Sequence, residues 1–230
     1  TNLASALGEM GRFEEAEPLG NRAWEGLQAV LGREHPYTLE AMQSRVQLLV
    51  QADRLEDAKP LASELITIRR VPCVRPNATA NEFHAYASIL VTCDVPGLRD
   101  PNAAQVAAKQ AVDMTESQNH QMLDVLAQAH WLLGDVEQAA EIGRKAAALL
   151  PPEGSITRAD VQSRLGGFLV AQARFSEAEP LLLESYDWMN THWEGSAGRV
   201  REFIERLDEL YRSWDHLERG KGYAEKASAY

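Results

Sequence analysis

The phrase Arg54-Leu55-Glu56-Asp57-Ala58-Lys59-Pro60-Leu61 decides the fold of this chain, because nearly the same phrase occurs three times within 230 residues. The other two full copies are Arg12-Phe13-Glu14-Glu15-Ala16-Glu17-Pro18-Leu19 and Arg174-Phe175-Ser176-Glu177-Ala178-Glu179-Pro180-Leu181. The alanines at positions 16 and 58 are one period of 42 residues apart. A fixed period of this length is typical of repeat proteins, in which each copy marks one supersecondary unit.

Three weaker copies complete the series. Two are centred on Ala104 and Ala139, and the third is Asp215-His216-Leu217-Glu218-Arg219-Gly220. The sequence therefore predicts about six units.

Each copy is interpreted as the turn inside a helical hairpin. A turn residue ends one helix, an apolar residue fills the space between the two helices, and acidic residues complement the dipole of the next helix. The small residue that follows lets the helices approach closely, and the proline is expected where backbone N–H groups still lack helical partners. The expected turn residues are Gly11, Asp53, Gly134 and Asp215, and the expected apolar residues are Phe13, Leu55, Val136, Phe175 and Leu217.

Helical spacing of apolar residues flanks these turns, as at Leu123, Leu126, Ala127, His130 and Leu133. No segment has the sustained alternation of a strand. A single hairpin cannot bury its apolar face alone, so neighbouring hairpins are expected to stack. The predicted fold class is all-α, an α-solenoid in which about six hairpins form a right-handed superhelix.

The expected units cover residues 1–31, 38–70, 81–113, 120–150, 158–190 and 199–229 of one repeat array that spans 1–230. Residues 71–80 are the expected hinge, because Pro72 and Pro76 exclude a continuous helix there.

The unit from Leu123 to Pro151 resembles a tetratricopeptide repeat of standard length, and the units of 42 residues resemble the longer kinesin light-chain type. The connector Leu31-Gly32-Arg33-Glu34-His35-Pro36-Tyr37-Thr38 carries this second resemblance, with Thr38 as the expected cap of the next helix. The family implies a scaffold that binds a protein or peptide in a concave groove.

A narrower resemblance concerns repeat arrays of planctomycete-type and related bacterial signalling proteins. The runs Thr92–Pro101, Trp131–Val136 and Leu210–Trp214 carry it. In such proteins the array often follows a serine/threonine kinase domain, which implies a tethered catalytic domain N-terminal to this chain. The missing initiator Met likewise indicates a piece of a longer polypeptide.

Charge and composition narrow the classes of partner. The formal net charge is −11, with 34 acidic and 23 basic residues, which disfavours nucleic acid as a partner. No apolar run approaches the roughly 18 residues of a membrane span. Without a secretory signal, a cytoplasmic location is expected.

The sequence contains none of the motifs of the common catalytic or phosphate-binding sites, so we expect no enzyme activity and no cofactor. Cys73 and Cys93 lie 20 residues apart without a paired CxxC, and the six histidines are scattered, so no metal site is expected. His130 is expected to pack between helices, and Trp193 to be exposed as a contact anchor.

The first helix of each hairpin is expected to line the groove. From their positions within the repeat, we expect the following residues to face the groove: Gln43, Gln47, His84, Ser88, Asp124, Gln128, Trp131, Ser163, Arg164, Glu205 and Glu209. The main hypothesis is a non-catalytic scaffold that binds a protein or peptide partner. The alternatives are a regulatory or docking arm of a larger signalling protein, such as a kinase, and a sensor of peptides or small molecules.

Overall fold

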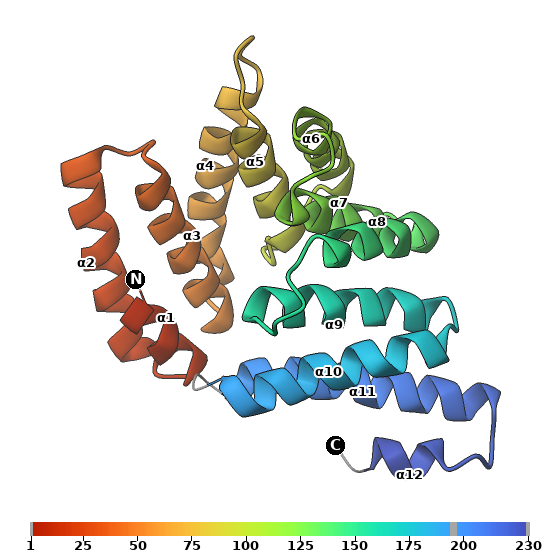
Figure 1. Cartoon of the computed structure of the whole chain (residues 1–230). Coiled ribbons are helices and arrows are strands. Elements are labelled where there is room, and N and C mark those ends of the chain that lie inside the picture. Colours follow the sequence, from red (N-terminus) through yellow and green to blue (C-terminus); the bar gives the residue numbers. More distant parts are fainter. Residues whose placement is uncertain (1, 194–196, 229–230) are drawn as a thin grey trace. The chain divides into compact units, whose positions relative to one another are not determined.

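The computed structural model describes residues 2–193 and 197–228, and within these ranges it contains twelve helices and no strand (Figure 1). The predicted all-α fold class is confirmed. The helices are α1 (Asn2–Glu9), α2 (Phe13–Leu31), α3 (Pro36–Gln51), α4 (Leu55–Cys73), α5 (Ala80–Thr92), α6 (Pro101–Met114), α7 (His120–Leu132), α8 (Val136–Ala148), α9 (Ile156–Ala171), α10 (Phe175–His192), α11 (Ala197–Leu217) and α12 (Tyr223–Ala227).

The chain divides into two compact units, Thr1–Ala107 and Ala108–Tyr230, and the division lies inside α6. In the first unit each helix from α1 to α5 packs on the next, and α1 also contacts α3. In the second unit each helix from α7 to α12 packs on the next, and α9 also contacts α11. Consecutive hairpins within each unit are thus stacked.

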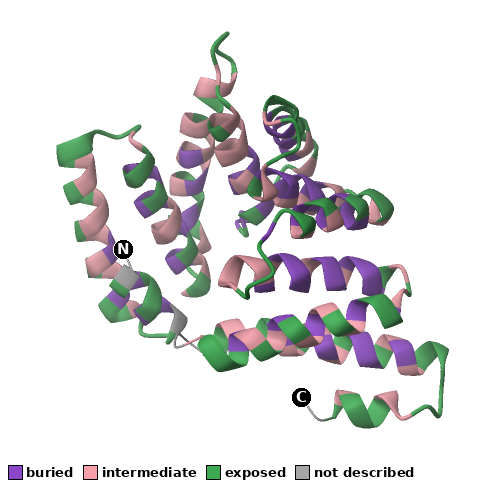
Figure 2. Cartoon of the chain, viewed as in Figure 1, coloured by how far each residue is buried: buried purple, intermediate pink, exposed green. Residues whose placement is uncertain are grey.

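The small residues of the repeated phrase lie in the cores of the two units. Ala16, Ala58, Ala139 and Ala178 are each 0% exposed, and Figure 2 shows buried positions along the helix faces that meet one another. The close approach of helices that the phrase predicts is confirmed at these four positions.

The first helix of several hairpins ends at a residue with left-handed backbone conformation. The residue after it donates a backbone hydrogen bond to a carbonyl near the end of the helix. Gly11 and Asp53 have φ values of 74° and 57°. The next residue in each case donates its N–H to a carbonyl five residues back, Arg12 to Leu7 at 2.9 Å and Arg54 to Leu49 at 2.8 Å. This is the Schellman pattern, which satisfies carbonyls left open at a helix end.

Gly134, with φ of 80°, and Ala173, with φ of 55°, repeat the pattern in the second unit. The turn residues expected at positions 11, 53 and 134 are therefore confirmed. Ala173 was not anticipated, since only a few per cent of non-glycine residues adopt positive φ.

The turn expected at Asp215 is wrong. Helix α11 continues to Leu217, which is 62% exposed and fills no space between helices. The chain turns instead at Gly220 and Gly222, whose φ values are 80° and 81°. The buried Trp214, stacked on Phe175 with ring centroids 5.6 Å apart, holds this part of α11 against α10.

Two further local expectations need correction. Pro18, Pro60 and Pro180 each occupy the sixth position of their helix, beyond the first turn, so each removes one intrahelical hydrogen bond. The cap of α3 is His35, whose Nδ1 accepts from the N–H of Tyr37, whereas Thr38 is buried inside the helix.

The connector between α4 and α5 is shorter than the range 71–80, because α4 extends through Pro72 to Cys73. Thr79 is the N-cap of α5 and forms a reciprocal capping box with Glu82. The hinge remains a prediction, and so do the unit boundaries; residues 1 and 229, which bound the first and last expected units, lie outside the described residues.

Candidate functional site

The nominated groove-facing residues divide between the two units. Gln43 and Gln47 lie on α3, and His84 and Ser88 on α5 of the first unit. Gln47 is exposed, while Gln43 is half-buried and accepts a long hydrogen bond of 3.5 Å from Arg69 of α4. The second unit holds the other nominated residues, on α7, α9 and α11.

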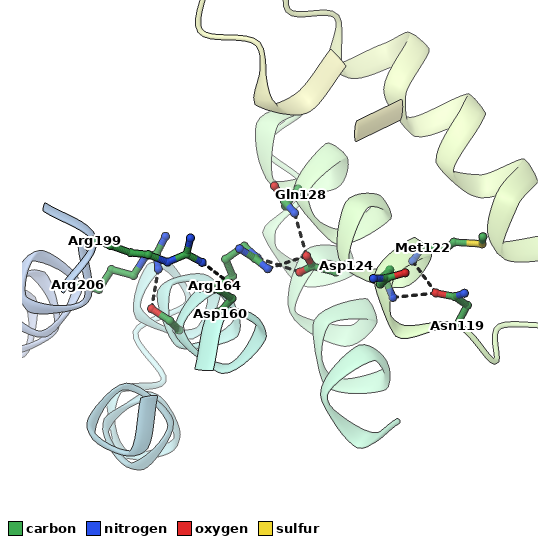
Figure 3. A network of polar contacts seen from close by, with 10 residues as sticks. Asn119, Met122, Asp124, Gln128, Asp160, Arg164, Arg199 and Arg206 are labelled. Carbon is green, nitrogen blue, oxygen red and sulfur yellow. Dashed lines mark hydrogen bonds and ion pairs between the residues drawn. The ribbon is translucent and has the colours of Figure 1, made fainter. Parts of the chain in front are cut away.

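In the second unit a network of polar contacts joins the first helices of successive hairpins (Figure 3). Asn119 caps α7 and so fixes where this helix starts. One turn further on, Asp124 accepts two hydrogen bonds from Arg164 of α9, at 2.9 and 2.7 Å. Gln128 donates to the same carboxylate at 3.0 Å. The nominated residues 124, 128 and 164 are thus brought together.

A second contact joins α9 to α11. Arg199 donates to Asp160 at 2.7 Å, and its guanidinium lies over the Trp193 ring, 5.1 Å from the centroid. The expectation that Trp193 is an exposed anchor is therefore wrong. This ring is half-buried and packs against the cluster around Met189 and Phe203.

The third contact is of a different kind. Arg206 of α11 donates to the hydroxyl of Ser163 on α9 at 2.6 Å. Ser163 is 0% exposed, so this nominated residue does not face solvent. Burial is the main cause that lowers the pKa of the Arg206 guanidinium, and the nearby charge of Arg164 lowers it further.

We call Asp124, Gln128, Asp160, Arg164, Arg199 and Arg206 the polar first-helix face. Repeat phase missed Asp160, Arg199 and Arg206. The signal for the first two was present, because Asp124 and Arg164, like Asp160 and Arg199, are opposite charges about one repeat apart. Such spacing places side chains on equivalent positions of stacked helices.

The remaining nominated residues lie along the same helices. Trp131 of α7 is 39% exposed, and its ring contacts Phe168 of α9 with centroids 5.1 Å apart. Glu205 and Glu209 are on α11, and both are exposed. An aromatic surface and two carboxylates therefore accompany the polar first-helix face.

The described residues were also searched for metal-binding clusters, reactive thiols and membrane-spanning helices. Within residues 2–193 and 197–228 no three His, Cys, Asp or Glu side chains are placed to hold a metal ion. Cys93 is buried and Cys73 half-buried, and burial raises the pKa of both thiols, so both are poor nucleophiles. No described helix is long and apolar enough to cross a membrane.

His130, at the end of α7, contacts the turn that follows this helix. Its side chain is 14% exposed, and Nδ1 is 3.0 Å from the carboxylate of Asp135, which also caps α8. The contact fixes the turn between α7 and α8.

The match to a family model concerns the N-terminal part of the chain. Residues 1–70 match the family model of the tetratricopeptide repeat. No curated protein matches the sequence.

Among solved structures, two crystal structures of nearly identical TPR-like repeats of a putative kinesin light chain from Podosopora anserina are similar to this chain. One is a variant with a single substitution, with 18% identity, coverage of 99% of this chain and 89% of that chain, and a TM-score of 0.41. The other has 19% identity, coverage of 99% and 91%, and a TM-score of 0.41.

The C-terminal part of a TPR repeat-containing protein from Cytophaga hutchinsonii has 16% identity, coverage of 98% and 92%, and a TM-score of 0.39. The matched range contains the repeated phrases at Arg12 and Arg54. Residues 1–70 of this chain are therefore tetratricopeptide repeats.

Proposed function

We propose that the polar first-helix face of the second unit binds a peptide segment of a protein partner. Tetratricopeptide repeats are generally protein-interaction scaffolds. The observation that carries the proposal is the network through Asp124–Arg164 and Asp160–Arg199, which fixes polar side chains on three successive first helices before any partner arrives.

Fixed side chains favour binding because less conformational entropy is lost when the partner docks. The half-buried donors and acceptors of this face, beside the exposed ring of Trp131, supply both directional and apolar contacts. A peptide with a matching row of polar groups and one apolar side chain fits this surface.

Photo-crosslinking of the full chain tests the location. Peptides selected from a random dodecamer library would be bound to three variants, each with p-benzoylphenylalanine at one position: Trp131, Glu205, or Asn190 as control. Asn190 is exposed on α10, outside the polar first-helix face. We expect crosslinks from positions 131 and 205 and few from 190. Equal crosslinking at all three positions, or strong crosslinking at 190 alone, would contradict the proposal.

A further inference from the structure

An open cleft lies between α11 and α12, beside the C-terminal end of α11. Its volume is about 530 Å³, which is within the range of small-molecule sites. The cleft shares no residue with the polar first-helix face, so it is a separate surface. Its lining residues are Asp208, Arg212, Asp215, His216, Arg219, Ala224, Ala227 and Ser228.

Helix α12 is held in place as one wall of the cleft. The ring of Tyr223 stacks on Trp214 of α11 with centroids 4.2 Å apart. Lys226 Nζ lies 2.7 Å from the carboxylate of Glu179 on α10. These contacts fix the wall before a ligand arrives, so less conformational entropy is lost on binding.

The opposite wall, on α11 and the turn after it, carries charges of both signs. Arg212 donates to Asp208 at 2.7 Å. Asp215 and Arg219 lie four residues apart, and neither side chain has a hydrogen-bond or ion-pair partner among residues 2–193 and 197–228. The cleft therefore offers a carboxylate and a guanidinium whose hydrogen-bonding capacity is unused.

The α12 wall is small and uncharged. Ala224 and Ala227 present methyl groups, and the hydroxyl of Ser228 donates to the Ala224 carbonyl, which leaves its oxygen able to accept. The lining contains no aromatic ring and no long aliphatic side chain among the described residues. A nucleobase or an acyl chain therefore finds no stacking or apolar surface here, and the cleft suits a small, strongly polar ligand.

We infer that the cleft between α11 and α12 binds the phosphate ester of a small polyol, a sugar phosphate. Arg219 and Arg212 hold the phosphate, because a planar guanidinium donates parallel hydrogen bonds to two phosphate oxygens. Asp215 accepts hydrogen bonds from the hydroxyl groups, because an ionised carboxylate is an acceptor only. The inference goes beyond the proposed function, which concerns another face of the second unit.

Isothermal titration calorimetry of the full chain is to compare glucose 6-phosphate, glucose and inorganic phosphate. We expect glucose 6-phosphate to bind about tenfold more tightly than either of the others, because each of them lacks one set of charged hydrogen bonds. Equal binding of glucose 6-phosphate and inorganic phosphate would overturn the role of the polyol. Equal binding of glucose 6-phosphate and glucose would overturn the role of the phosphate.

Two variants assign the two halves of the ligand. Arg219→Gln should weaken the binding of glucose 6-phosphate about tenfold and leave the binding of glucose unchanged. Asp215→Ala should weaken the binding of glucose 6-phosphate by a similar factor and leave that of inorganic phosphate unchanged. Arg201→Gln, at an exposed position of α11 outside the cleft, is the matched control and should bind like the original chain. Thermal unfolding should show that all three variants are folded.

Amide hydrogen exchange separates this site from the polar first-helix face. Glucose 6-phosphate should slow exchange in the C-terminal part of α11 and in α12, and leave α7 and α9 unchanged. Slower exchange in α7 and α9 in place of α12, or full affinity in Arg219→Gln, would overturn the inference. Binding of none of the three probes would also overturn it and leave the proposed peptide binding untouched.

Discussion

At the scale of the residue, the informative contrast is between shielded and exposed ion pairs. The side chains of Asp124 and Arg164 are 14% and 27% exposed, so their ion pair is shielded from water. Lys145 and Glu141 form a pair on α8 that is 58% and 56% exposed. Partly buried pairs with two hydrogen bonds stabilise more than exposed ones, and breaking them leaves a charge without its partner.

Arg164→Ala should therefore lower the free energy of unfolding by about 1–3 kcal/mol, because the Asp124 carboxylate loses two charged hydrogen bonds. Lys145→Ala should leave it nearly unchanged, because water screens the exposed pair. Urea denaturation of the two variants measures both effects. Equal losses would show that the shielding of the Asp124–Arg164 pair is unimportant.

The carboxylate of Glu82 should make the cap of α5 pH-dependent. Hydrogen bonds from the backbone N–H and side chain of Thr79 lower the pKa of Glu82 below its ordinary value. A lowered folded-state pKa gives stability that is present above the unfolded pKa and is lost as the pH falls through the folded value.

Glu82→Gln should accordingly lower the free energy of unfolding at pH 7. The difference in this free energy between the variant and the original chain should shrink as the pH falls toward 3. Thermal unfolding across this range is the measurement, with Glu34→Gln at an exposed turn position as the control. An unchanged difference between pH 7 and pH 3 would contradict the role of the ionised cap.

At the scale of the element, close helix packing depends on small residues at single positions. A Cβ added at Gly166 on α9 would lie 2.5 Å from Leu182 Cγ of α10, and Leu182 is only 1% exposed. A Cβ added at the adjacent Gly167 would meet nothing within 4 Å. Substitution of these two neighbouring glycines therefore compares a tightly packed position of α9 with an open position of the same helix.

Gly166→Ala should cost about 1–3 kcal/mol of stability, because the buried leucine has no room to move. Gly167→Ala should raise stability by up to about 1 kcal/mol through helix propensity. Melting temperatures of the two variants give the comparison. A loss in Gly167→Ala and none in Gly166→Ala would show that the face of α9 against α10 is misassigned.

At the scale of the whole molecule, the chain is a series of hairpins that divides into two compact units. In repeat proteins stability is approximately a sum of unit and nearest-neighbour terms, so damage in one hairpin weakens chiefly its neighbours. Ala16 and Ala178 are equivalent positions, each 0% exposed, in the first and second units.

Ala16→Trp should therefore speed amide hydrogen exchange mainly in α1 to α3, and Ala178→Trp mainly in α9 to α11, because overpacking forces each local core apart. Exchange followed by mass spectrometry on peptic fragments resolves the two regions. Uniform acceleration over the whole chain in both variants would show one cooperative structure in place of separable hairpins.

The sequence by itself determined the features that depend on nearby residues. The repeated phrase predicted paired helices, turns at Gly11, Asp53 and Gly134, and the burial of Ala58 and its equivalents. Turn chemistry and apolar periodicity act over a few residues, so they can be read along the chain. It also placed Asp124 and Arg164 on equivalent helix faces.

The tertiary structure decided the features that depend on contacts between stacked helices, namely where α11 ends and which side chains pair across helices. Helix α11 runs past Asp215 because Trp214 is buried against Phe175, a contact that the weak sixth copy of the phrase did not reveal. Ser163 is buried under Arg206, which leaves that arginine bonded to a hydroxyl in place of a carboxylate. Such pairings are set by the angles and distances between helices about forty residues apart, which repeat phase does not specify.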